Sequence, residues 1–201
     1  GKKITANDFL WSFTRASSPS TLSITAEDYL GDIIGVKDVI KGDSEVISGI
    51  KVIDDLTLQI NIDSPKAYFL AKLTYPVAFV LDKENLKESN WMDKPNGSGP
   101  FILDEYLIGE KLVLKRNLNW HKTPAKLEYV SMNLAGGSAM AMYENGEIDI
   151  TGVGMADLER VLDPDNILNK DVVVAPLDFS QYYIGFNMEK PPFDDIFFRQ
   201  A

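Results

Sequence analysis

The stretch GEIDITGVGMADLERVL, residues 146–162, joins a charged turn, a short strand, a glycine-broken loop and the start of a helix. Just before it, residues 138–146 predict a helix, because a serine favours the helix start and a glycine its end. Strands are predicted around these helices, at residues 127–134, 149–153, 172–177 and 182–187. Alternating strands and helices are typical of an α/β lobe, so the quoted stretch is interpreted as one crossover unit.

The amino-terminal part of the chain has a different pattern. Thr5 and Asp8 have the spacing of a capping box, which predicts a helix that ends near Arg15. The alternating apolar residues of GIKVIDDLTLQINI predict a hairpin that turns at residues 54–55. A serine and a proline at the start of residues 64–76 predict a further helix, which the next proline ends.

The glycine- and proline-rich segment NGSGP, residues 96–100, separates two apolar regions and predicts a boundary between lobes. A second hairpin follows at residues 101–117, with Gly109 in its turn. We therefore divide the chain into one lobe at residues 1–95 and a second at residues 96–201.

The amino-acid composition argues against several classes of partner and of chemistry. Thirty acidic residues against twenty basic ones give a net charge of −10, which argues against nucleic acid and anionic membrane surfaces as partners. No apolar run approaches the roughly 20 residues of a membrane-spanning helix. The chain has no cysteine, and its single histidine, His121, lies beside Trp120 in a loop. We expect no catalytic residue, no metal site and no cofactor.

Paired carboxylates leave one enzymatic alternative open. Two acidic side chains across a sugar bond can hydrolyse it, so a carboxylate-dependent hydrolase is the alternative from another class. Each pair nevertheless falls in a predicted turn or helix cap, where aspartate is favoured for bonding to nearby backbone amides. The pairs are Asp54 with Asp55, Glu147 with Asp149, Asp163 with Asp165, and Asp194 with Asp195.

Six segments together carry a resemblance to a known family. They are GKKITANDFLWSFTRA, GIKVIDDLTLQI, GSGPF, LVLKRNLNW, YENGEIDI and YYIGFNMEKPPFDDIFFRQA, in this order along the chain. In order and spacing they resemble the family 5 bacterial extracellular solute-binding proteins, which are the oligopeptide, dipeptide and nickel receptors of ABC importers. The resemblance implies an α/β fold of the periplasmic-binding-protein class II type, with two lobes that close on a ligand.

The resemblance also implies that this chain is a fragment. Residues 1–95 would form most of a small accessory lobe, and residues 96–201 the central part of the first ligand-binding lobe, with a mixed sheet. The second ligand-binding lobe would be absent, so we expect no high-affinity peptide binding by these residues alone. The helix predicted after Asp194 runs to Ala201 without a stop signal, which agrees with this expectation.

By the same resemblance, the strand SQYYIGFN borders the ligand cleft. The implied ligand-binding residues are Gln181, Tyr182, Tyr183, Asn187, Ser98 and Met155. The implied partners are a short peptide and the membrane subunits of an importer, for a monomeric protein in a periplasm or tethered by lipid outside the cell membrane. A peptide-signal receptor of the same fold is the second alternative.

Overall fold

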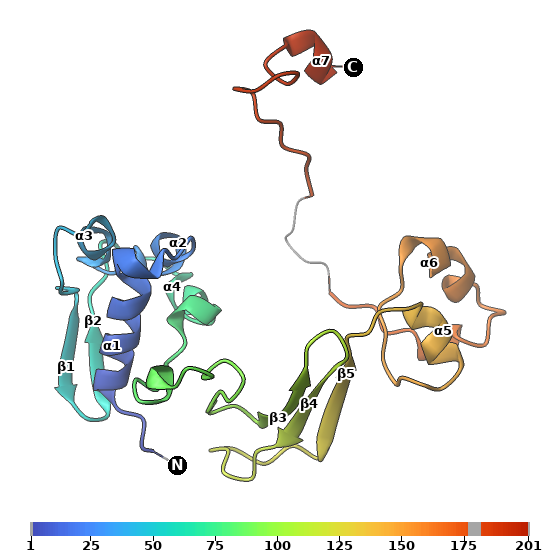
Figure 1. The fold of residues 1–201 in the computed structure, drawn as a ribbon, viewed down its shortest axis with the longest axis horizontal. Coiled ribbons are helices and arrows are strands. Elements are labelled where there is room, and N and C mark those ends of the chain that lie inside the picture. Colours follow the sequence, from blue (N-terminus) through green and yellow to red (C-terminus); the bar gives the residue numbers. More distant parts are fainter. Residues whose placement is uncertain (1, 177–181, 201) are drawn as a thin grey trace. The chain divides into compact units, whose positions relative to one another are not determined.

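A computed structural model describes residues 2–176 and 182–200 (Figure 1). The chain divides into two compact units, Gly1–Gly136 and Gly137–Ala201. The first unit begins with α1 (Ala6–Ser17), α2 (Ala26–Leu30), α3 (Val36–Lys41), β1 (Ile50–Asp54), β2 (Thr57–Ile60) and α4 (Phe69–Lys72). It continues with β3 (Phe101–Leu107), β4 (Lys111–Arg116) and β5 (Tyr129–Asn133). The second unit contains α5 (Ala139–Glu144), α6 (Met155–Leu162) and α7 (Ile196–Gln200). Short 3-10 turns occur at Pro19–Thr21, Pro76–Ala78, Asn85–Lys87 and Asn169–Asp171.

The first helix begins where the capping pattern predicts. The backbone N–H of Thr5 donates to Asp8 Oδ2 at 2.7 Å, and its hydroxyl donates to the same oxygen at 2.9 Å. The helix ends at Ser17, two residues beyond the predicted Arg15. Pro19 explains the end, because a proline forces the residue before it out of the helical region, and Ser18 is indeed extended.

The predicted hairpin at residues 50–62 is confirmed as the antiparallel pair β1 and β2. Its turn is fixed by Asp54, whose Oδ1 accepts a hydrogen bond of 2.8 Å from the backbone N–H of Leu56. The apolar side chains that alternate along β2 and beyond it, Leu58, Ile60 and Ile62, pack against the core. One apolar face and one polar face therefore arise as the period of two predicts.

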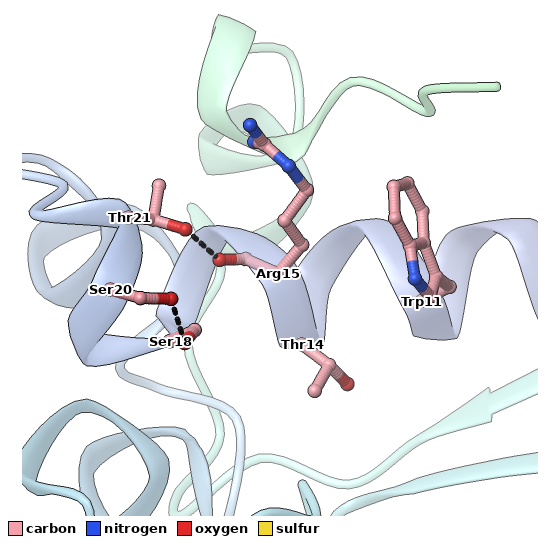
Figure 2. A pocket seen from close by; sticks show the side chains of 6 residues that line it. All are labelled: Trp11, Thr14, Arg15, Ser18, Ser20 and Thr21. Atoms are coloured by element: carbon pink, nitrogen blue, oxygen red, sulfur yellow. Dashed lines mark hydrogen bonds between the residues drawn. The ribbon is translucent and has the colours of Figure 1, made fainter. Parts of the chain in front are cut away.

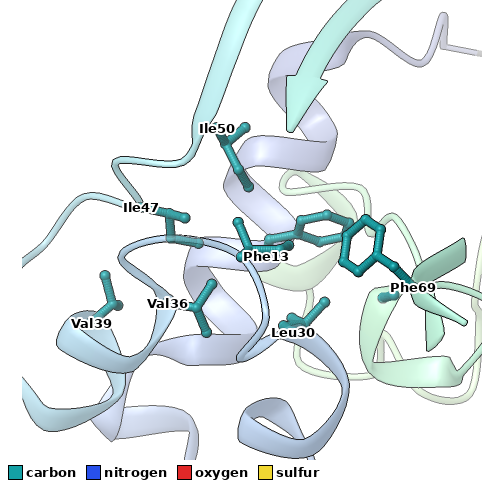
Figure 3. Packing of buried hydrophobic residues seen from close by; sticks show 9 residues of the cluster. Phe13, Leu30, Val36, Val39, Ile47, Ile50 and Phe69 are labelled. Carbon is teal, nitrogen blue, oxygen red and sulfur yellow. The ribbon is translucent and has the colours of Figure 1, made fainter. Parts of the chain in front are cut away.

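The core of this unit collects side chains from α1 to the turn at Pro76–Ala78. Figure 3 shows Phe13, Leu30, Val36 and Ile47 converging between helices α1, α2 and α3. The core comprises Phe13, Leu30, Ile33, Val36, Val39, Ile47, Ile50, Phe69 and Ala78.

Gly49 lies where three backbone segments meet beside this core. Its N–H donates to the carbonyl of Ile34 at 2.7 Å, and its own carbonyl accepts from the N–H of Asn61 at 2.7 Å. A Cβ at this position would lie only 2.6 Å from the Ile34 oxygen. Only glycine permits so close an approach of two backbones.

The helix predicted at residues 64–76 is wrong in extent, because only Phe69–Lys72 form α4. The Ser64 hydroxyl donates to Asp63 Oδ1 at 3.0 Å instead of capping a helix. Lys66, within the predicted first turn, reaches Asp32 Oδ1 at 2.6 Å. These side-chain interactions fix the segment in a non-helical conformation up to Tyr68.

The second predicted hairpin is confirmed as β3 and β4, and β5 extends it to a sheet of order β3-β4-β5. Gly109 has a φ of 76° in the turn, a conformation that glycine adopts without strain. Every strand pair among the described residues is antiparallel. The parallel pairing that a mixed sheet requires is therefore not found in the part of the chain described.

In the second unit, α5 and α6 form as predicted. The Ser138 hydroxyl accepts a hydrogen bond of 3.3 Å from the backbone N–H of Ala141 at the start of α5. Arg160 of α6 binds Glu144 of α5 at 2.7 Å, which ties the two helices together.

The strands predicted at residues 149–153, 172–177 and 182–187 are wrong, because none of their described residues is in a strand, residue 177 lying outside the described ranges. A strand requires a neighbour for its backbone hydrogen bonds, and no described segment of this unit supplies one. The last helix also differs from its prediction. Its N-terminal turn is closed by Asp195, whose Oδ1 accepts from the N–H of Phe197 at 2.7 Å, rather than by Asp194.

Candidate functional site

Ser98 lies in a cleft of about 660 Å³ in the first unit. Apolar side chains from the segment after α4 and from β3 line one part of the cleft, including Leu81, Trp91 and Ile102. Its polar lining includes Lys2, Asp8, Asp82, Asn85, Asn96, Asn117 and Asn119. The size falls in the range of small-molecule sites, which are mostly apolar with a few polar groups.

The polar groups of this cleft bind one another. Asp82 accepts hydrogen bonds from Lys2 Nζ at 3.1 Å and from Asn96 Nδ2 at 2.8 Å. The bond to Lys2 lowers the pKa of the Asp82 carboxyl, and the same bond raises the pKa of Lys2. Asn117 Nδ2 donates to the carbonyl of Gly99 at 2.8 Å. Of these contacts, the one between Asn96 and Asp82 crosses the predicted boundary at residue 96, which indicates a structural role.

Three of the residues predicted to contact a ligand, Tyr182, Tyr183 and Asn187, lie at residues 182–187, which form neither a helix nor a strand. Tyr182 and Tyr183 are 96% and 83% exposed. Asn187 Oδ1 accepts from the backbone N–H of Glu189 at 3.1 Å and so closes a local turn. Gln181 lies outside the described residues.

Phe186 follows the two tyrosines but packs locally. Its ring centre lies 5.0 Å from that of Phe193, which in turn lies 5.7 Å from Phe198 of α7. Met155, at the start of α6, is 87% exposed. Ser98 belongs to the first unit, whereas Met155 and the two tyrosines belong to the second. Within the second unit, exposed aromatic and thioether side chains are thus available for contact with another molecule.

One carboxylate of each pair accepts a local hydrogen bond. Asp54, Asp163 and Asp195 each accept a backbone N–H two residues ahead, at 2.7 to 2.9 Å. Glu147 Oε1 accepts from Asn145 Nδ2 at 3.2 Å. These contacts are those of turns and caps, and they give the hydrolase alternative no support.

No other reactive centre is found among the described residues. His121 packs edge-on against Trp120, with ring centres 5.5 Å apart. Within residues 2–176 and 182–200, no group of three or more histidine, aspartate or glutamate side chains is placed to hold a metal ion. No helix in these ranges is long and apolar enough to cross a membrane.

Sequence reasoning missed one charged cluster in the first unit. Asp32, whose side chain is 13% exposed, binds Lys66 at 2.6 Å and Lys72 at 2.7 Å. These two hydrogen bonds, first that of Lys66, lower the pKa of Asp32. Beside it, the rings of Tyr29 and Tyr75 stack with centres 3.7 Å apart. The partners are 34 to 46 residues apart in the chain, so no local pattern could have found them.

Comparisons with known proteins cover the whole chain. Residues 1–201 match the sequence profile of the family described as "Bacterial extracellular solute-binding proteins, family 5 Middle". The chain is 29% identical to the probable deoxycholate-binding periplasmic protein YgiS of Escherichia coli, across 100% of this chain and 38% of that protein. It is also 29% identical to the periplasmic oligopeptide-binding protein OppA of Escherichia coli, again across 100% of this chain and 38% of the relative.

Solved structures agree with this match. A periplasmic oligopeptide-binding protein from Borrelia burgdorferi superposes with a TM-score of 0.79 and 25% identity, across 100% of this chain and 41% of that one. The murein tripeptide-binding protein MppA of Escherichia coli gives a TM-score of 0.72 and 28% identity, across 82% of this chain and 34% of that one. The chain therefore spans about two fifths or less of the length of these proteins.

Proposed function

Because the chain belongs to the bacterial extracellular solute-binding proteins of family 5, we propose that it is part of the substrate-binding component of an ABC importer. This component binds short peptides outside the membrane and delivers them to the permease. The observation that carries the proposal is the family match over all 201 residues, together with relatives named for binding oligopeptides and dipeptides. A periplasmic or extracellular location follows from the same relatives.

The chemistry of the described residues supports binding without catalysis. A receptor needs a groove, aromatic and backbone contacts and a means of closing, but no tuned acid, base or metal. The exposed Tyr182 and Tyr183 are suited to such contacts, since aromatic rings offer large contact areas. Adjacent residues in an extended chain point to opposite sides, so one of the two rings faces the ligand in this proposal. Gln181, Asn187, Ser98 and Met155 complete the proposed set.

We propose the division into lobes at the same boundary as before. Residues 1–95 form an accessory lobe, supported by the core between Phe13 and Ala78. Residues 96–201 form part of the first ligand-binding lobe, supported by the sheet that starts directly after NGSGP. Partners of the whole protein are a short peptide and the importer's membrane subunits, and the protein is a monomer tethered by lipid or free in a periplasm.

Calorimetry on the full-length protein that contains this chain tests the proposal. Titration with mixtures of di- to pentapeptides is expected to give saturable binding, and mass spectrometry is expected to recover the peptides intact. Cleaved peptides would favour the hydrolase instead. Absence of any peptide binding by the folded protein would refute the proposal.

Paired variants test the proposed site. Two variants, Tyr182→Ala and Tyr183→Ala, each remove one ring. The variant that removes the ring facing the ligand is expected to bind peptide about tenfold more weakly, which is about 1.4 kcal/mol. Tyr106→Ala, an exposed tyrosine on β3, is the matched control and is expected to bind normally. Normal binding by both Tyr182→Ala and Tyr183→Ala would remove this segment from the site.

A further inference from the structure

A second cavity lies on the accessory lobe, and none of its lining residues belongs to the set proposed to bind peptide. It has a volume of about 520 Å³ and opens where α1 ends and the turn Pro19–Thr21 begins. Figure 2 shows its lining, in which Trp11 and Arg15 project from the same side of α1. Their spacing of four residues places them on one helix face. The lining residues are Trp11, Thr14, Arg15, Ser18, Ser20 and Thr21.

Arg15 is the charged residue of this lining. The chain has four arginines, and the guanidinium groups of Arg116, Arg160 and Arg199 all donate to carbonyl or carboxylate oxygens. Arg15 as a residue is half-buried, and its guanidinium donates to none of the described residues although it carries five N–H groups. In Figure 2 its end points away from the axis of α1.

The charge around the cavity is opposite to that of the chain. The net charge of the protein is −10, yet none of the six lining residues is acidic. A second cation is close by, since Lys83 Nζ lies 5.9 Å from the centre of the Trp11 ring. A ligand with a carboxylate therefore complements this surface, because a guanidinium binds carboxylates with two parallel hydrogen bonds.

The remaining lining indicates a ligand rich in hydroxyl groups. The Ser18 and Ser20 hydroxyls lie 2.8 Å apart, and the Thr21 hydroxyl donates to the Arg15 carbonyl. Each hydroxyl keeps acceptor lone pairs, so the cavity offers alternating donors and acceptors beside an aromatic ring. We propose that this cavity binds an acidic sugar, a pyranose bearing a carboxylate, with its ring against Trp11 and its carboxylate on the Arg15 guanidinium.

The helix end decides where the carboxylate binds. The carboxyl end of α1 carries partial negative charge and repels anions. The Arg15 carbonyl is already bonded by the Ser18 N–H at 3.1 Å and by the Thr21 hydroxyl. The carboxylate therefore binds at the outer end of the guanidinium, and the sugar hydroxyls lie nearer to the helix end.

NMR titration of the ¹⁵N-labelled 201-residue chain tests this proposal, because its three tryptophans give three separate indole signals. D-glucuronate is expected to shift the Trp11 indole signal with a Kd of about 1 mM, the range of a weak small-molecule site. D-glucose lacks the carboxylate and acetate lacks the ring, so both are expected to bind at least about tenfold more weakly. The same titration with an oligosaccharide that contains glucuronate shows whether the natural ligand is a free sugar acid or part of a glycan chain. The ligand with the lower Kd, free glucuronate or the oligosaccharide, identifies the source.

Variants complete the test. Arg15→Gln is expected to weaken glucuronate binding about tenfold, while Lys51→Gln makes the same change of charge on the exposed β1 and is expected to leave binding unchanged. An NMR spectrum of Arg15→Gln with the same signal dispersion as wild type shows that this variant is folded. If Arg15→Gln does not fold, Arg15→Lys is used instead, since it keeps the charge but loses the planar guanidinium. No shift of the Trp11 signal, equal shifts with acetate, or equal binding by the Arg15 and Lys51 variants would each overturn the proposal.

Discussion

Replacing Gly49 by alanine should destabilise the accessory lobe, because backbone segments from distant parts of the chain meet at this glycine. The new Cβ would lie 2.6 Å from the Ile34 carbonyl oxygen, 2.7 Å from the Asn61 carbonyl oxygen and 2.9 Å from the Ile34 nitrogen. All three are backbone atoms, so no side-chain rotation relieves the contacts. The backbone must separate instead, which strains the hydrogen bonds of 2.7 Å on both sides of Gly49.

The expected cost is about 3 kcal/mol of the free energy of unfolding, the upper part of the range for overpacked sites. Gly97→Ala is the matched control, because nothing lies within 4 Å of its Cβ position and its φ is not positive. The control should change the free energy by less than about 0.5 kcal/mol. Urea unfolding followed by tryptophan fluorescence measures both variants. Equal unfolding midpoints for the two alanine variants would refute the reasoning.

Three further predictions concern the same lobe. Leu30→Ala, at a fully buried leucine, should lower the free energy of unfolding in urea by about 2 to 5 kcal/mol. Leu22→Ala, at a leucine that is 84% exposed, should leave it almost unchanged. Similar losses in the two variants would contradict the described core. Ser17→Ala should raise the free energy of unfolding by about 1 kcal/mol, because the buried Ser17 hydroxyl has no hydrogen-bond partner among the described residues, and a loss of stability would reveal one. Asp32→Asn should lower the thermal midpoint at neutral pH, because the variant loses the charge that binds the two lysines. The folded pKa of Asp32 lies below its ordinary value of 3.8, so the difference in midpoint from wild type should vanish as the pH falls through that folded pKa. A difference in midpoint that does not depend on pH would count against the lysine pairs.

Local patterns predicted the elements that local interactions fix. The first helix begins at Thr5 because the capping contacts to Asp8 lie within one turn. The two hairpins have turns of two and three residues and an apolar face with a period of two. The short helix α3 was not predicted, because its six residues lie between Gly35 and Gly42 and contain little helical periodicity.

Interactions between distant residues explain the failures. The segment at residues 182–187 has the composition of a strand, but composition does not provide the neighbour that a strand must pair with. The contacts that bring Lys66 and Lys72 to Asp32 span more than thirty residues. For the site, the resemblance supplied candidate residues, whereas the cavity beside Arg15 required the side-chain positions.

The wide sequence span of the accessory-lobe core has a consequence for synthesis. This core uses residues from Phe13 in α1 to Ala78, so it cannot be completed until the ribosome has released the whole stretch between them. Until then the apolar face of α1 is covered only in part, by the segments of the core that precede Phe69 and Ala78. A nascent chain stalled before Ala78 should thus be held by chaperones or digested by protease, and one stalled well beyond it should resist digestion.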